Sequence, residues 1–335
     1  MNLPPMLRLL LWPLSVLYGQ LVRVRAALYA RGTLRQHRLN RPVISVGNLT
    51  VGGTGKTPMV IWLAERFLAE GKRVGILSRG YKGAGGTSDE IELMKYRLKN
   101  QVAFGVGADR FANGKLLETD VDLFLLDDGF QHLRLARDAD ILLMDASQPL
   151  ARQTMLPTGR LREPVSAMTR ADILVFTRTE TVPGTSAAIE RFRDYPVFSA
   201  ATRLLGFRRL GTGIQTSSRD EIGPGPFYAF CGIGNPKAFF RDLQNWNIAV
   251  ASQCGFADHH RYDQRDAQEL CTAARHAGAS ALLTTEKDAQ NLAGVTFAEM
   301  PAYVAVIDLE IAKEEALLNL LREKIAARMP VVIAS

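Results

Sequence analysis

The chain has 335 residues, 47% of them hydrophobic and 22% charged, without repetitive or low-complexity stretches. This composition argues against a disordered or fibrous protein, and the length predicts two lobes, because a single core rarely grows past ~250 to 300 residues. The three cysteines, Cys231, Cys254 and Cys271, have no C-x-x-C spacing. We therefore expect neither a disulfide framework nor a zinc site, and a reducing cytosol fits best.

The formal net charge of +7 comes from an N-terminal segment, residues 1–41. This segment holds seven arginines and no acidic residue, while the other 34 basic residues balance 34 acidic ones. A surface that binds nucleic acid is therefore not expected, because the excess charge is confined to one segment and no stripe of basic and aromatic residues follows it.

Apolar residues at helical spacing accompany these arginines between positions 7 and 28. Pro13, Ser15, Gly19 and Arg23 interrupt the run, which falls short of the ~20 apolar residues of a spanning helix. We predict that residues 1–41 dock in the membrane interface, where anionic headgroups attract each arginine by ~1 kcal/mol. A secretory signal peptide and an amphipathic helix packed on its own domain are the alternatives.

Residues 42–205 alternate short apolar runs with amphipathic stretches, which predicts an α/β core with a parallel sheet of the P-loop NTPase type. A helix is expected over 58–69, because Gly71 follows this amphipathic stretch. Ligands of such sheets bind at the carboxyl ends of the strands. The predicted strands are 43–46, 74–77, 121–126, 141–144 and 173–176.

A glycine-rich segment, residues 47–57, lies between the first predicted strand and this helix. Glycines let backbone N–H groups face phosphates, and the start of a helix favours anions. Lys56 would reach the β- and γ-phosphates and Thr57 would hold Mg²⁺. The strict phosphate-loop pattern has Gly where Thr50 stands, and a glycine turn without nucleotide is the alternative. We predict that ATP and Mg²⁺ bind here, on Gly52, Gly53, Thr54, Gly55, Lys56 and Thr57.

Two carboxylates, Asp127 and Asp128, end the buried strand predicted at 121–126. Acids at this position of a nucleotide-binding sheet meet the metal of the bound nucleotide, whereas in isolation such a pair is often a turn or a helix cap. We assign Asp127 to the metal and Asp128 to catalysis, although the sequence does not determine which of them binds Mg²⁺.

A stretch rich in Ser, Gly and Pro, residues 216–226, predicts a linker, which we place at 206–226 and expect to act as a hinge that lets the lobes close. A smaller C-terminal α/β domain is expected over 227–335. Its predicted strands are 227–231, 248–251, 281–284 and 304–307. Gly232-Ile233-Gly234 lacks the third glycine of a dinucleotide fingerprint and is interpreted as a tight turn.

The run from Asp127 to His132, Asp-Asp-Gly-Phe-Gln-His, resembles the signature of the tetraacyldisaccharide 4'-kinases, the lipid A 4'-kinases of Gram-negative lipopolysaccharide synthesis. The phosphate-loop context resembles that family too, including the missing first glycine. Further matches follow in family order between about residues 40 and 290: Ser78-Arg79-Gly80-Tyr81, Gly107-Ala108-Asp109-Arg110, Gly159-Arg160-Leu161-Arg162-Glu163-Pro164, Gly232-Ile233-Gly234-Asn235-Pro236, Asp258-His259-His260 and Thr285-Glu286-Lys287-Asp288-Ala289.

The resemblance implies an ATP-dependent lipid kinase. Such an enzyme transfers the γ-phosphate to the 4'-hydroxyl of tetraacyldisaccharide 1-phosphate, an acylated disaccharide lipid, and forms lipid IVA. It implies a peripheral position on the cytoplasmic face of the inner membrane, with anionic lipids as the docking surface and no obligate protein partner. The alternative function is a membrane-associated P-loop ATPase switch that transfers phosphate only to water.

The resemblance also implies a catalytic carboxylate and a magnesium-associated glutamate after Ser78-Arg79-Gly80-Tyr81, which here match Asp89 and Glu90. We predict that His259 is the partner of Asp89. Among the remaining candidates, Arg160 and Arg162 could hold a phosphate through forked donors or belong to a solvated loop, and we assign Arg160 to ATP. His132 and Lys287 could serve the site, or could only satisfy a core hydrogen bond and begin a helix, respectively.

Overall fold

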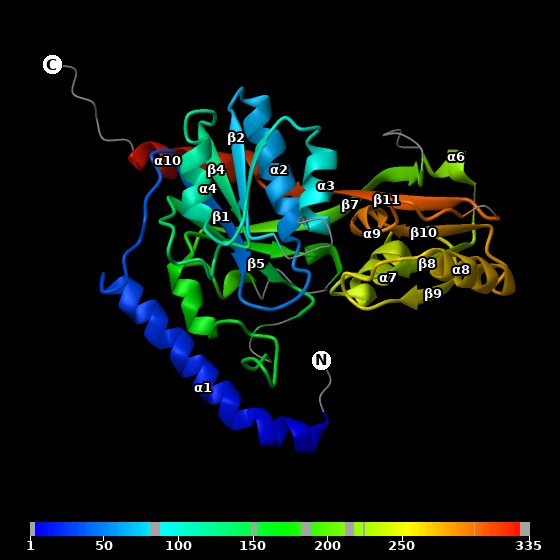
Figure 1. Ribbon diagram of the computed structural model, residues 1–335, viewed down its shortest axis with the longest axis horizontal. Helices are drawn as coiled ribbons and strands as arrows, with labels where there is room; N and C mark the ends of the chain where they lie inside the picture. Colours follow the sequence, from blue (N-terminus) through cyan, green and yellow to red (C-terminus); the bar gives the residue numbers. More distant parts are fainter. Residues whose placement is uncertain are drawn as a thin grey trace. The chain divides into compact units, whose positions relative to one another are not determined.

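The computed structural model describes residues 4–80, 88–148, 150, 153–181, 189–211, 218–223, 225–297 and 299–328. The chain forms two compact units (Figure 1). Unit 1 comprises Met1–Tyr81, Arg97–Ala201 and Ile311–Ser335, and unit 2 comprises Lys82–Tyr96 and Thr202–Glu310. Each unit is therefore assembled from stretches that are separated in the sequence.

The sheet of unit 1 confirms the predicted parallel architecture. Its strand order is β3-β2-β4-β1-β5-β6-β7, and the registered neighbours in this order all pair in parallel. The apolar runs predicted as strands form β1, β2, β4, β5 and β6, which are buried along their whole length because helices cover both faces of such a sheet. The strands are β1 (Val43–Asn48), β2 (Val74–Ser78), β3 (Ala103–Val106), β4 (Leu123–Asp127), β5 (Ala139–Asp145), β6 (Ile173–Thr177) and β7 (Val197–Arg209).

The helices of unit 1 pack their apolar faces on this sheet. In α2, Met59, Trp62 and Phe67 are buried, and Gly71 follows the helix at a φ of 75°, a conformation that glycine adopts readily. The helical segments are α1 (Pro5–Ala30), α2 (Lys56–Ala69), α4 (Arg110–Leu117), α10 (Glu314–Arg328) and the short 3₁₀ turns η2 (Val165–Arg170) and η3 (Thr179–Thr181).

The N-terminal helix α1 packs on unit 1 along a stripe of small residues. Ser15 and Gly19 are its buried residues, and the Ser15 hydroxyl lies 2.8 Å from that of Thr158. Tyr18 donates a hydrogen bond to the carbonyl of Arg162 at 2.9 Å. The predicted alternative of a helix packed on its own domain is thus realised along this stripe.

The opposite side of α1 exposes large apolar residues to solvent. By length and composition α1 is long and apolar enough to cross a membrane. The sequence had predicted that its interrupted apolar run is too short for a spanning helix. Only 11% of its most apolar window is buried, so the helix keeps an unusually apolar exposed surface. The exposed residues are Met6, Leu7, Leu9, Leu10, Trp12, Leu14, Val16, Leu17, Leu21 and Val24.

Unit 2 is a smaller α/β layer structure, as predicted. Its strand order is β11-β10-β8-β9, and residues 202–209 of β7 lie beside β11. Alternate residues of β8 face opposite cores: Phe227 packs with α7 on one face, and Phe230 packs with α8 on the other. The elements are α3 (Asp89–Arg97), α6 (Arg219–Ile222), β8 (Phe227–Cys231), α7 (Pro236–Asn245), β9 (Val250–Gly255), α8 (Gln264–His276), β10 (Ala281–Thr285), α9 (Glu286–Gln290) and β11 (Ala302–Ile311).

The two units depart from the domain boundaries expected at 205 and 227. Residues 82–96, expected in the core, belong to unit 2, and residues 311–335 belong to unit 1. The C-terminal helix α10 stays with unit 1 because Leu317 and Leu321 are completely buried and Lys324 pairs with Asp172 at 2.5 Å. Of the expected linker, 206–209 are strand and Arg219–Ile222 are helix, while 212–217 and 224 lie outside the described residues.

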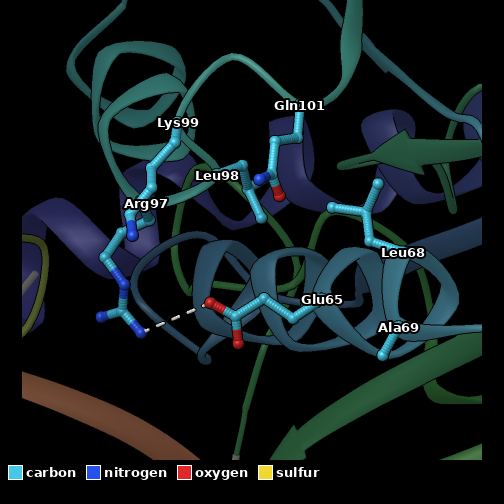
Figure 2. Close-up of a pocket in the computed structure, with 7 residues that line it drawn as sticks. All are labelled: Glu65, Leu68, Ala69, Arg97, Leu98, Lys99 and Gln101. Carbon is cyan, nitrogen blue, oxygen red and sulfur yellow. Dashed lines mark ion pairs between the residues drawn. The ribbon is translucent and has the colours of Figure 1, made fainter.

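A surface groove of about 370 Å³ lies in unit 1 beside the end of α2 (Figure 2). Arg97 reaches across it to Glu65 at 3.9 Å. None of the residues that the sequence predicted for the site lines this groove, so the groove is not part of the predicted site. Its lining residues are Glu65, Leu68, Ala69, Arg97, Leu98, Lys99 and Gln101.

Candidate active site

The phosphate loop connects β1 to α2 in unit 1, in the position predicted from the sequence. Gly52 and Gly55 adopt φ angles of 107° and 89°, which side chains other than glycine rarely tolerate. The helix begins at Lys56, so the free N–H groups of its first turn face the loop. The loop therefore has the backbone geometry that binds phosphate.

The two predicted acids lie at the end of β4, beside β1. Val46 pairs with Asp127 in the register of the two strands, which brings the acids next to the start of the phosphate loop. Asp127 accepts a hydrogen bond from the Ser78 hydroxyl at 3.0 Å. Asp128 follows with a φ of 47°, a conformation that aspartate tolerates better than most residues.

Asp128 forms a two-pronged ion pair with Arg162 at the nucleotide site. Both of its carboxylate oxygens accept from Arg162 at 2.7 Å, and the Lys56 ammonium lies 3.7 Å away. Burial opposes ionisation, but the hydrogen bonds from Arg162 and the charges of Lys56 and Arg162 outweigh it and hold the pKa of Asp128 well below its usual range. Asp128 is consequently an anion at neutral pH.

Asn48, at the end of β1, joins this cluster. Its side-chain oxygen accepts from Lys56 at 3.4 Å and from Arg162. Among the described residues, no hydrogen-bond partner satisfies the buried Nδ2 of Asn48 or the buried hydroxyl of Thr54. Two polar groups of the loop region are thus available to an oxygen-rich ligand such as a nucleotide phosphate.

Arg160 forms hydrogen bonds with the backbone of the phosphate loop at Val51. Its guanidinium donates from two nitrogens to the carbonyl of Val51 at 3.1 and 2.7 Å, and the Val51 N–H donates back to the Arg160 carbonyl at 2.8 Å. Arg160 therefore fixes the backbone that would hold ATP, and its predicted direct contact with ATP stays a prediction.

A second cluster lies in unit 2 and brings together Asp89 and His259, which are 170 residues apart. His259 Nδ1 lies 2.9 and 3.0 Å from the two carboxylate oxygens of Asp89. Burial alone would raise the pKa of Asp89, but the contacts with His259 and Glu90 and the charge of Lys287 hold it well below its usual range. The hydrogen bond with Asp89 in turn raises the pKa of His259. The pairing expected from the sequence is thus present, inside one unit.

Lys287 lies among the acids of this second cluster. Its ammonium is 2.9 Å from Glu90, 3.3 Å from Asp258 and 3.5 Å from Asp89. Burial lowers the pKa of Lys287, but these carboxylates raise it to about 12. Asp89, Glu90 and His259 offer ligand atoms within 4.8 Å of one another, so this is also the group of described residues that could hold a metal ion.

Sequence reasoning missed three contributors to the cluster around Asp127 and Asp128. Asn48 and Ser78 end β1 and β2, just beyond the strands predicted at 43–46 and 74–77, and their position at the carboxyl edge of the sheet was the available signal. Arg162 was considered only as a phosphate contact or a loop residue. His132 lies half-buried near several arginines, and burial followed by the charges of Arg110 and Arg137 lowers its pKa to about 4, so it is neutral at pH 7.

A family model, curated relatives and a solved structure that resemble this chain all belong to the same kinase family. The family model of tetraacyldisaccharide-1-P 4'-kinase matches residues 7–326. The tetraacyldisaccharide 4'-kinases of Geobacter metallireducens and Geobacter sulfurreducens are 41% and 39% identical to the chain, over 90% and 88% of its length and 94% and 87% of theirs. The crystal structure of LpxK from Aquifex aeolicus in complex with ATP superposes with a TM-score of 0.76 at 32% identity, and covers 95% of this chain and 99% of that one.

Proposed function

The chain belongs to the tetraacyldisaccharide-1-P 4'-kinase family, and we propose which of its residues bind ATP and which activate the acceptor hydroxyl. It is therefore a kinase of lipid A biosynthesis, as the motifs predicted, and the alternative of an ATPase switch is not favoured. In this proposal unit 1 binds ATP with Mg²⁺, and unit 2 provides the base that activates the 4'-hydroxyl of the acylated disaccharide 1-phosphate.

In unit 1 the phosphate loop and Lys56 bind the β- and γ-phosphates. Lys56 stabilises the charge that moves onto the bridging oxygen during transfer. Thr57 and Asp127 offer the hard oxygen donors that Mg²⁺ prefers, and the metal when bound neutralises charge on the β- and γ-oxygens. The unpartnered polar groups of Asn48 and Thr54 fit this assignment, because a nucleotide phosphate satisfies them.

Of the two acids, Asp127 is the better candidate for the metal. Both oxygens of Asp128 accept from Arg162, whereas Asp127 ends β4 in register with Val46, next to the start of the phosphate loop. Asp128 instead holds Arg162 and Lys56 in place, so that both cations stay beside the loop when phosphate arrives. Asp127 thus keeps the expected role at the metal, whereas Asp128, which was expected to be catalytic, is assigned to positioning the two cations.

In unit 2, Asp89 acts as the base and His259 as its partner. The observation that carries this assignment is the contact of His259 Nδ1 with both oxygens of Asp89, at 2.9 and 3.0 Å. A loose phosphoryl-transfer transition state needs alignment first and proton removal late. Asp89 stays ionised until the hydroxyl proton moves to its carboxylate, and the imidazole keeps that carboxylate oriented.

The N-terminal helix brings the enzyme to its lipid. One stripe of α1 is fixed on unit 1 by Ser15 and Tyr18, and this favours a helix that lies on the membrane over one that crosses it. The exposed apolar side then enters the interface, and the arginines of residues 1–41 contact anionic headgroups. We assign this surface to the cytoplasmic face of the inner membrane, where ATP is present.

Thin-layer analysis of products from γ-labelled ATP tests the proposal. Wild-type protein should place label in the lipid, and Asp89→Asn should lower kcat by ~10² to 10⁴ with little change in the KM for ATP. Glu92→Gln on the same helix is the matched control, because Glu92 pairs with Lys95 at 3.0 Å and takes no part in the proposed chemistry. Near-wild-type turnover by a folded Asp89→Asn variant would remove Asp89 as the base, and label only in free phosphate would contradict lipid transfer.

A further inference from the structure

One ammonium group, that of Lys287, lies among three carboxylates from two separate stretches of unit 2. Glu90 and Asp89 belong to the first turn of α3, at 2.9 and 3.5 Å, and Asp258 belongs to the loop that follows β9, at 3.3 Å. The side chain of Lys287 is only 20% exposed. Charge pairs at this depth are screened by water much less than pairs on the surface.

The backbone that carries Lys287 is held rigidly. The next residue, Asp288, is fully buried. Its carboxylate accepts from the Gly232 N–H at 2.7 Å, from the Tyr262 hydroxyl at 2.9 Å and from the Thr285 hydroxyl at 2.6 Å. These bonds attach α9 to the turn after β8, so the position of the ammonium is fixed by the fold rather than by a flexible surface chain.

The same turn also fixes the backbone of His259. The Gly232 carbonyl accepts from the His259 N–H at 3.0 Å, and His259 adopts a φ of 61°, which a histidine rarely does without support. Gly232 therefore binds the backbone of His259 through its carbonyl and the carboxylate next to Lys287 through its N–H, so one turn holds both residues that contact Asp89. Asn291, just beyond α9, donates a third contact to Asp89 at 3.3 Å.

The positive charge of Lys287 compensates the mutual repulsion of the three carboxylates around it. Asp89, Glu90 and Asp258 would repel one another at this spacing, and His259 alone carries at most one compensating charge. Lys287 supplies a second, permanent charge at the point where the three acids converge. Removing it would push the first turn of α3 away from the loop that holds Asp258 and His259.

We propose that Lys287 is a positioning residue of the kinase reaction, whose ammonium holds the first turn of α3 so that the Asp89 carboxylate keeps its orientation toward the acceptor hydroxyl. This inference rests on the proposed role of Asp89 as the base. It gives Lys287 a task in phosphoryl transfer without contact with either substrate. Displacements of about 1 Å at a reacting group can cost up to ~10² in rate, which sets the size of the expected effect.

The test is steady-state kinetics of Lys287→Met, which keeps the length of the side chain and removes its charge. We expect kcat to fall ~10- to 100-fold while the KM for ATP stays within about twofold, because the phosphate loop belongs to unit 1. Lys287→Arg keeps the charge and should recover a large part of kcat. Lys95→Met is the matched control and should leave kcat unchanged, since Lys95 lies on α3 and pairs with Glu92 at 3.0 Å, and Glu92 takes no part in the proposed chemistry.

A double variant separates this inference from the role of Asp89 itself. If Lys287 acts through Asp89, then Asp89→Asn combined with Lys287→Met should be no slower than Asp89→Asn alone. A strong loss in Asp89→Asn together with normal kcat in Lys287→Met, or losses that multiply in the double variant, overturns the positioning role and leaves the base in place. Normal kcat in Asp89→Asn overturns the base and the positioning role with it. Thermal unfolding of each variant identifies misfolding, and Lys287→Gln replaces Lys287→Met if the latter does not fold.

Discussion

Four leucines on the outward side of α1 offer a direct test of membrane docking. Leu10, Leu14, Leu17 and Leu21 follow one another at helical spacing, and each is between 52% and 74% exposed. Replacing all four by Gln removes four of the exposed apolar side chains of α1 while retaining a residue that favours helices. The packed stripe of Ser15 and Gly19 is untouched by this change.

The exposed areas set the size of the effect. Complete burial of a leucine side chain is worth roughly 2 kcal/mol, so each of these residues would gain about 1 to 1.5 kcal/mol in the lipid interface. Four of them together give about 5 kcal/mol, and one factor of ten corresponds to ~1.4 kcal/mol. The quadruple variant should therefore bind vesicles roughly 10³- to 10⁴-fold more weakly than the wild type.

Sedimentation with vesicles that contain an anionic lipid measures this binding, and kcat/KM on vesicle-borne and on detergent-dispersed substrate separates docking from chemistry. Tyr18→Phe is the control, because it removes the hydrogen bond to Arg162 on the packed stripe. It should keep vesicle binding and lose about 1 kcal/mol of unfolding free energy. A quadruple variant that is folded and still binds vesicles like the wild type would refute docking through this side of the helix.

Three further predictions concern unit 1. Lys56→Ala should lower kcat by ~10² or more without loss of folding, whereas the exposed Lys72→Ala should not; a folded Lys56→Ala enzyme with over a tenth of wild-type kcat contradicts the phosphate-loop assignment. Gly47→Ala should lower the free energy of unfolding, measured in urea, by about 1 to 3 kcal/mol, since the added Cβ would lie 2.5 Å from Phe130 Cβ. Gly53→Ala is the control and should cost little, because no atom lies within 4 Å of its added Cβ. Equal stabilities of the two variants would refute the clash. His132 has a folded-state pKa of about 4 against 6.5 in the unfolded chain, so the unfolded state protonates first and stability falls between pH 6.5 and 4. Between pH 6.5 and 4 the free energy of unfolding of His132→Gln should therefore fall by about 1 to 2 kcal/mol less than that of the wild type, after allowance for solvent screening. Parallel curves of stability against pH for the two proteins would contradict the low pKa of His132.

The strands and the nucleotide loop could be predicted from local sequence because their signals are contiguous. Continuous apolar runs give buried parallel strands, and the loop between β1 and α2 places Lys56 and Thr57 within a few residues of one another. The acids at the end of β4 follow by the same logic, since neighbouring parallel strands end at one edge. β3 and β7 were not predicted, because β3 has only four residues and β7 alternates between buried and exposed positions without a continuous apolar run.

The partners of these residues depend on tertiary structure. Asp128 meets Arg162 from 34 positions away, and Asp89 meets Asn291 from 202 positions away. The local sequence around Lys287 does not show whether the residue forms ion pairs with distant acids or only belongs to the first turn of a capped helix. In the structure Lys287 does both. The assignment of the described residues 88–96 to unit 2 likewise follows from contacts between residues far apart in the sequence, which composition does not encode.

The N-terminal helix shows the division most clearly. Its sequence determined that residues 1–41 are basic and that an apolar helix begins the chain, because charge and helical spacing are properties of neighbouring residues. Only the fold decided which side packs. Ser15 and Gly19 are small enough to let the helix approach Thr158 and Met155 closely, so the polar stripe is buried and the leucines are left facing solvent.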